Sequence, residues 1–184
     1  MPGTGEYTLA TTPVTYRRRL GEAASANVNS PSGRSDLETS LEDMRGELPN
    51  CSSVSLVVSW FGDDLRAGSC IVQPKVEQRI DDGVEMPWTV SGLTRGQAVE
   101  IGKVEDRSIY GGTPADKSVL EAIEAIQLGG QRVMFYPFLL MEILAGNSKP
   151  DPWSDSVEQP TLPWRGRMTG AKAPGILGSS DGTA

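Results

Sequence analysis

The sequence contains no histidine and only two cysteines, Cys51 and Cys70. Structural zinc sites are built from four Cys or His ligands, so we expect no metal site in this chain. The absence of histidine also excludes any catalytic triad or dyad that uses a histidine base. We expect no bound cofactor, and we predict that both cysteines are reduced, buried small residues with no joint function.

Long apolar runs are also missing. No stretch reaches the about 18 apolar residues that a membrane-spanning helix requires. The N-terminal residues MPGTGEYTLATTPV lack the basic flank and apolar core of a signal peptide. We therefore expect no membrane insertion and no secretion, with synthesis in the cytoplasm.

Basic residues are in the minority, since 17 Lys and Arg face 24 Asp and Glu for a net charge of −7. Binding to nucleic acid depends on basic side chains that neutralise phosphates, so we expect no nucleic-acid partner. The one basic cluster is Arg17, Arg18 and Arg19. It can bind a phosphate or an acidic partner, but we interpret it as a solvated or partner-facing contact surface.

The 184 residues are enough for one domain with a real core. Aromatic residues make up only 6%, and 21 Gly and 13 Pro lie mostly outside the periodic segments, which predicts a small core with long irregular parts. We divide the chain into an extended arm (residues 1–29), an α/β section (residues 30–146) and an irregular C-terminal tail (residues 147–184).

The α/β section contains two helix-then-strand units. Ser35 and Glu38 have the spacing of a capping box, and four apolar residues follow on one helical face, namely Leu37, Leu41, Met44 and Leu48. A β-branched run at residues 54–60 follows this helix. In the second unit, Thr113 and Pro114 are typical of a helix start, and Gly129 ends the helix.

The second strand is the near-continuous apolar run QRVMFYPFLLME at residues 131–142. Strands that read as continuous apolar runs are typical of buried parallel sheets. We therefore predict that residues 54–60 and 133–140 are buried parallel strands of one sheet. The C-terminal ends of such strands are where ligands and chemistry collect, so a site is sought first after these two strands.

Five motifs follow one another along the chain: ELPNCSSVSLVVSWFGDDLRAGSCIVQPKVE, PWTVSGLTR, YGGTPADKSVLEAI, VMFYPFLLME and PDPW followed by PWRGRMT. Together, and in this order, they resemble the TIM-barrel-like domain of the large tail-tip "megatron" proteins of gene transfer agents and related phages. The resemblance covers most of residues 35–169. The resemblance implies a baseplate or host-specificity component of a virion, with a barrel like that of a glycoside hydrolase but not necessarily its activity.

A (β/α)₈ barrel typically needs about 250 residues, and only two helix-then-strand units are visible here. The chain therefore resembles a partial (β/α) barrel-like section with extended N- and C-terminal arms. Either a second chain completes the barrel, or the shortened protein has a structural role with its edges covered by other tail or baseplate subunits. Both alternatives place it in an assembly.

If the hydrolase chemistry is retained, a general acid and a second carboxylate are needed about 5 to 10 Å apart. Asp63 or Asp64 after the first strand, with Glu142 after the second, are the candidates. The alternative is that Asp63 and Asp64 begin a solvated loop with Arg66 as an ion-pair partner, and that Glu142 is a strand-end charge. We favour the alternative, because half a barrel leaves no deep pocket to raise one carboxyl pKa.

The four tryptophans allow two interpretations. In the first interpretation, they form a binding platform for a host cell-surface glycan, because aromatic faces stack on the apolar faces of sugars. In the second, which we favour, they are aromatic anchors at contacts between subunits. The residues concerned are Trp60, Trp88, Trp153 and Trp164.

Overall fold

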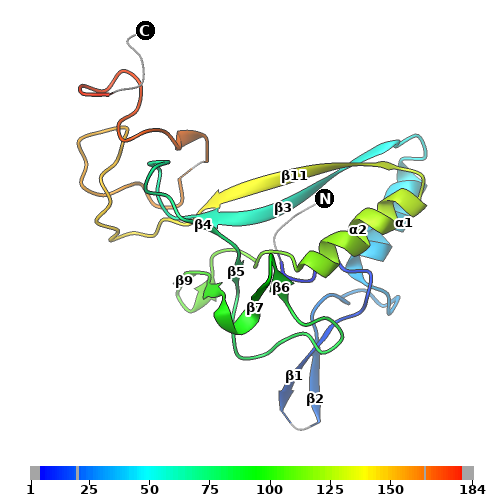
Figure 1. The fold of residues 1–184 in the computed structure, drawn as a ribbon. Helices are drawn as coiled ribbons and strands as arrows, with labels where there is room; N and C mark the ends of the chain where they lie inside the picture. Colours follow the sequence, from blue (N-terminus) through cyan, green and yellow to red (C-terminus); the bar gives the residue numbers. More distant parts are fainter. Residues whose placement is uncertain (1–4, 20, 164, 180–184) are drawn as a thin grey trace. The chain divides into compact units, whose positions relative to one another are not determined.

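The computed structural model describes residues 5–19, 21–163 and 165–179 and has a mixed α/β fold with several small sheets (Figure 1). Its elements, in chain order, are β1 (Thr15–Arg19), β2 (Glu22–Ser25), α1 (Asp36–Glu47), β3 (Ser53–Gly62), β4 (Val72–Gln73), β5 (Lys75–Val76), β6 (Thr89–Val90), β7 (Leu93–Thr94), the 3-10 turn η1 (Arg95–Gln97), β8 (Val99–Glu100), β9 (Lys103–Val104), β10 (Arg107–Ser108), α2 (Asp116–Leu128), β11 (Arg132–Met141) and the 3-10 turn η2 (Arg165–Arg167).

Both predicted helix-then-strand units are present, as α1 followed by β3 and α2 followed by β11. The N-cap of α1 is confirmed at Ser35, whose hydroxyl accepts the Glu38 N–H at 3.3 Å. The Glu38 carboxylate accepts a bond from the Ser35 hydroxyl at 3.4 Å. The predicted cap of α2 is wrong. Its N-cap is Ala115, two residues after Thr113, and the Thr113 hydroxyl accepts the Lys75 N–H at 3.1 Å.

The central sheet has the strand order β11-β3-β4. The Arg132 N–H donates to Ser52 O at 2.9 Å, and ten residues further on Glu142 N–H donates to Gly62 O at 2.8 Å. The two strands therefore run in the same direction with an uninterrupted register, which confirms the predicted parallel pair. β4 pairs with β3 in the antiparallel direction.

Burial of the second strand was predicted wrongly. Most of β3 is buried or half-buried. In β11, by contrast, five of the first six residues are exposed, and the other, Val133, is half-buried. Met134 is 55% exposed, Phe135 51% and Tyr136 41%. The physical reason is position in the sheet: β3 has a strand on each side, while β11 is the outermost strand in the order.

The chain forms two compact units, each made of two segments. Unit 1 comprises Met1–Ser59 and Pro74–Phe138, and unit 2 comprises Trp60–Gln73 and Leu139–Ala184. In unit 1, α1 and α2 pack on one face of β3. This core contains Leu9, Leu37, Leu41, Val54, Leu56, Val58, Ala122 and Ile126.

The segment expected to be an extended arm belongs to unit 1. Tyr7, Leu9, Ala10 and Val14 are each at most 2% exposed. The prediction of a separate arm at residues 1–29 is therefore corrected for its described part. Low apolar content suggested an arm, but a few fully buried side chains are enough to hold the segment in the core.

Unit 2 has its own small core of Leu65, Met141 and Ile143, against which Leu139 and Met168 pack. The tail predicted at residues 147–184 is irregular, since among its described residues only η2 forms a helical turn. It is nevertheless packed: Gln159 is 1% and Ala173 0% exposed.

The remaining sheets are two-stranded: β1 with β2, β6 with β7, β9 with β10, and the parallel pair β5 with β8. Ser91 and Gly92 connect β6 to β7 with φ of 50° and 81°, the two positive values that a tight hairpin turn requires. None of the sheets formed by the described residues closes into a barrel.

Candidate functional site

The strand ends of the central sheet bring the predicted carboxylates into neighbouring segments of unit 2. Asp63 and Asp64 directly follow β3, and Glu142 directly follows β11. The backbone bond from Glu142 N–H to Gly62 O is 2.8 Å long, so the two strand ends lie side by side. The parallel register thus places these acidic residues at one edge of the sheet, as predicted.

Asp64 is 2% exposed and fully engaged. Its carboxylate accepts hydrogen bonds from Arg66 Nε at 3.0 Å, Arg66 Nη2 at 2.6 Å and Gln159 Nε2 at 2.8 Å. Burial alone would raise its pKa, but the bonds from Arg66 and Gln159 outweigh burial and lower the pKa to about 2. Asp64 is therefore a buried, ionised anchor, and a carboxylate held in this state is a poor general acid.

Asp63 is also engaged. Lys149 Nζ lies 3.0 Å from its Oδ2, and the Ile71 N–H donates to its Oδ1 at 2.7 Å. One carboxylate thus holds both the loop that follows β3 and the segment that follows β11. Glu142 is half-buried beside them and has interactions of its own. The ion pair of Asp64 with Arg66, predicted as part of the alternative to catalysis, is confirmed. The solvated loop start predicted with it is wrong at Asp64, because this residue is buried.

The tryptophans do not share one role. Trp88 is 0% exposed in unit 1, and its Nε1–H donates to Thr113 O at 2.8 Å, so its predicted role as a contact residue is corrected to a core role. Trp60 is half-buried in β3. Trp153 is 36% exposed, but the Arg167 guanidinium lies 5.6 Å from its ring centre and occupies one ring face. Trp164 lies outside the described residues.

A buried polar cluster in unit 1 was not predicted. Arg95, 3% exposed, forms two bonds to the Glu6 carboxylate at 3.1 and 2.7 Å and one to Asp82 at 2.8 Å. The Tyr7 and Tyr16 rings each lie 5.9 Å from the guanidinium carbon. No motif marks this cluster, because its members are spread over residues 6–95 and Arg95 sits in a turn.

Glu77 borders this cluster and has a raised pKa, because burial and the neighbouring Glu6 carboxylate both disfavour its charge. Its backbone N–H donates to Glu6 Oε1 at 2.8 Å, and its carboxylate accepts the Gly112 N–H at 3.3 Å. A cavity of about 230 Å³ opens beside Glu6, Tyr16 and Glu77. The arrangement joins the N-terminal segment to the loop after β5.

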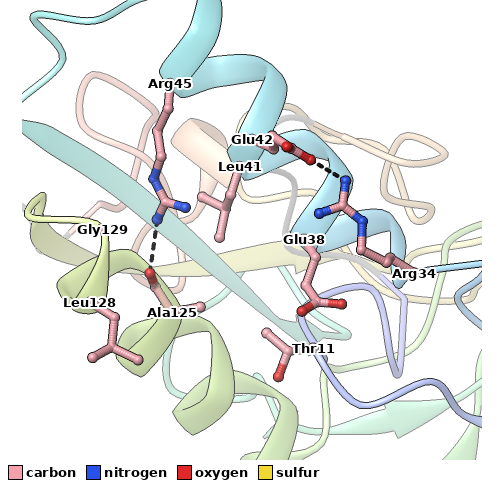
Figure 2. A pocket seen from close by; sticks show the side chains of 9 residues that line it. All are labelled: Thr11, Arg34, Glu38, Leu41, Glu42, Arg45, Ala125, Leu128 and Gly129. Atoms are coloured by element: carbon pink, nitrogen blue, oxygen red, sulfur yellow. Dashed lines mark hydrogen bonds and ion pairs between the residues drawn. The ribbon is translucent and has the colours of Figure 1, made fainter. Parts of the chain in front are cut away.

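A larger cavity of about 410 Å³ lies between α1 and α2 (Figure 2). Figure 2 shows two arginines at its rim, and each is already paired. Arg45 donates to Ala125 O at 2.9 Å, near the C-terminal end of α2, and Arg34 forms an ion pair with Glu42. A Cβ on Gly129 would meet the Arg45 guanidinium, so a larger residue at this position would have to displace the end of that flexible side chain. At this cavity, the bond from Arg45 to Ala125 O therefore connects α1 to α2.

Fold and side chains together define an α/β protein in which two of the three candidate carboxylates, Asp63 and Asp64, form ion pairs. No protein-family model and no curated protein matches this sequence. Within the described residues, no three Cys, Asp or Glu side chains are grouped to hold a metal ion. No helix in that part of the chain is long and apolar enough to cross a membrane.

Proposed function

We propose that this protein is a structural subunit of a phage or phage-like tail tip or baseplate, where it acts through protein–protein contacts. The motif resemblance supports the tail-tip assignment. The observation that carries the structural role is the exposure of Met134, Phe135 and Tyr136 on the outermost strand of a parallel pair. Exposed apolar side chains gathered along an edge strand are typical of interaction sites.

Parallel strands support this proposal in a second way. Sheets of this kind occur almost only with both faces covered, because helices or other layers shield their apolar side chains. In unit 1, α1 and α2 cover one face of β3. We propose that the two helix-then-strand units form a section of a (β/α) barrel, and that other tail or baseplate subunits cover what this section leaves open.

Hydrolysis of envelope glycans is not favoured by the candidate carboxylates. Glycoside hydrolysis requires one carboxyl group with a raised pKa and a second that reaches the substrate. Asp64 instead has a lowered pKa and is 2% exposed, and Asp63 is paired with Lys149. These side chains hold the loops after β3 and β11.

The proposal is tested on purified tail particles of the element that encodes this chain. Quantitative mass spectrometry should find the chain at a fixed copy number, and gold-labelled antibody should bind at the tail tip. Deletion of the gene should yield particles without a complete tip. Complete, infective particles that lack the chain would contradict the proposal.

A further inference from the structure

The free edge of β11 has a defined set of backbone donors. Residues of a strand point their backbone groups alternately to the two sides, and Arg132 points its N–H toward β3. The register is uninterrupted, so Met134 and Tyr136 also face β3, and Val133 and Phe135 face the open edge. Among the described residues, no strand pairs with that edge.

Two positions limit the free edge. Val133, Phe135 and Pro137 are alternate residues and point their backbone groups to the same, open side of β11. The lack of an N–H at Pro137 therefore costs no bond to β3. On the N-terminal side, the Gln131 N–H already donates to Ile126 O at 3.2 Å. Between these two positions, the open edge offers two donors, Val133 and Phe135.

The exposed side chains lie on both faces of β11. Val133 packs with the core that contains Val54, so odd-numbered residues such as Phe135 share the helix-covered face. Even-numbered residues share the other face, where the Tyr136 and Phe138 ring centres are 6.1 Å apart. Met134 and Tyr136, 55% and 41% exposed, are thus on the face opposite the helices.

A second copy of this chain does not cover these surfaces. Two copies related by a two-fold axis can join their β11 edges only as antiparallel strands. In a parallel pair, a residue that faces the partner strand lies opposite a residue that faces away, and a symmetric pair would place each residue opposite its own copy. That arrangement puts the helices of both copies on the same side and leaves Met134 and Tyr136 open. The three exposed side chains offer roughly 300 Å² per copy, against about 800 Å² per partner in a stable interface.

We propose that the open edge of β11 accepts one extended strand from a different protein, which pairs with the backbone of Val133 and Phe135. This inference rests on the proposed function and names the kind of partner that the assembly supplies. The partner strand is apolar on both sides, so that it contacts Phe135 on one face and Met134 and Tyr136 on the other. Its chain continues over the face that the helices do not cover.

Two variants at one position separate backbone pairing from side-chain packing. Phe135→Ala removes the ring and keeps the outward N–H, whereas Phe135→Pro removes both and leaves the bonds to β3 intact. Each variant is co-expressed with wild type in equal amounts, and its share in purified tail particles is measured. We expect Phe135→Pro to compete about tenfold less well than Phe135→Ala, as loss of a buried hydrogen bond predicts. Thermal unfolding of each isolated chain checks that both variants are folded.

Residue-resolved hydrogen exchange gives an independent measurement on unmodified protein. In the isolated chain, the amides of Val133 and Phe135 should exchange freely while those of Met134 and Tyr136 are protected. In the particle, the first two should become protected by at least about tenfold.

Equal competition by the two variants, with unchanged exchange at Val133 and Phe135, would overturn strand addition even if the chain is in the particle. Concentration-dependent protection of these amides in the pure chain would identify a second copy as the occupant instead. Absence of the chain from particles would refute the proposed function itself.

Discussion

Replacing Asp64 by asparagine tests whether its ion pair with Arg66 holds unit 2 together. The Asp64 side chain is 4% exposed, and its Oδ2 lies 2.6 Å from Arg66 Nη2. Burial opposes ionisation, but the bonds from Arg66 and Gln159 lower the pKa from 3.8 to about 2. A shift of this size corresponds to about 2.5 kcal/mol of unfolding free energy. We expect Asp64→Asn to lose about 2 kcal/mol at about pH 7. The loss arises because the amide leaves the partly buried Arg66 guanidinium without its charged partner.

The pH dependence follows from the lowered pKa. A carboxyl group whose pKa falls on folding contributes stability above its ordinary pKa, and this contribution is lost as the pH falls from 3.8 toward about 2. About half of it remains at about pH 3, so the difference between wild type and Asp64→Asn should narrow by about half there.

Urea-dependent hydrogen exchange of peptides from residues 60–73 and 150–173 measures the unfolding free energy of unit 2. Asp155, exposed in the same unit, provides the matched control. Asp155→Asn should change this free energy by no more than about 0.5 kcal/mol. An Asp64→Asn effect that is as small as the control, or that stays the same size at both pH values, would refute the role given to the ion pair.

Three further predictions follow from the same contacts. Because Glu77 has a raised pKa, its ionisation destabilises the fold. The stability contributed by protonated Glu77 is full below its ordinary pKa of 4.5 and is lost as the pH rises through the raised value. In thermal unfolding, Glu77→Gln should therefore gain stability relative to wild type between about pH 4 and about pH 7. Gly129→Ala should displace the Arg45 guanidinium and cost its bond to Ala125 O, about 1 kcal/mol in urea unfolding, and an unchanged midpoint would contradict that contact. Amide substitution of the three strand-end carboxylates should leave glycan cleavage by the particle unchanged, and a large loss with normal assembly would revive the hydrolase interpretation; the residues are Asp63, Asp64 and Glu142.

Local patterns predicted the backbone of this fold well. The Ser35 cap, the apolar face of α1 and the apolar runs of β3 and β11 depend on residues close in sequence, and the elements formed in the predicted order. The face of α1 is confirmed at Leu37 and Leu41, which are buried, and wrong at Leu48, which ends the helix and is 57% exposed. The parallel pairing followed from the two helix-then-strand units, because such connections favour parallel neighbours. The same patterns placed Asp63 and Glu142 at one sheet edge.

Features that depend on distant residues were not predictable. Burial of β11 was overestimated because an apolar run has the same composition whether a neighbouring strand covers it or not. Thr113 was assigned a helix cap because its bond to Lys75, far away in sequence, leaves no local trace. The Arg95 cluster joins the N-terminal segment to a turn nearly ninety residues later, which no periodicity reveals.

The central claim, that other subunits cover the apolar surface of β11, is tested most directly by hydroxyl-radical footprinting of Met134 and Tyr136. Both side chains react readily with hydroxyl radicals, and both are exposed in the chain by itself, at 55% and 41%. The purified chain and the intact tail particle are oxidised under the same dose, and Trp88, fully buried, serves as the internal reference. The account predicts that oxidation of Met134 and Tyr136 falls at least about fivefold in the particle, as removal of most of their accessible surface implies. Equal oxidation of these two residues in both samples would contradict it.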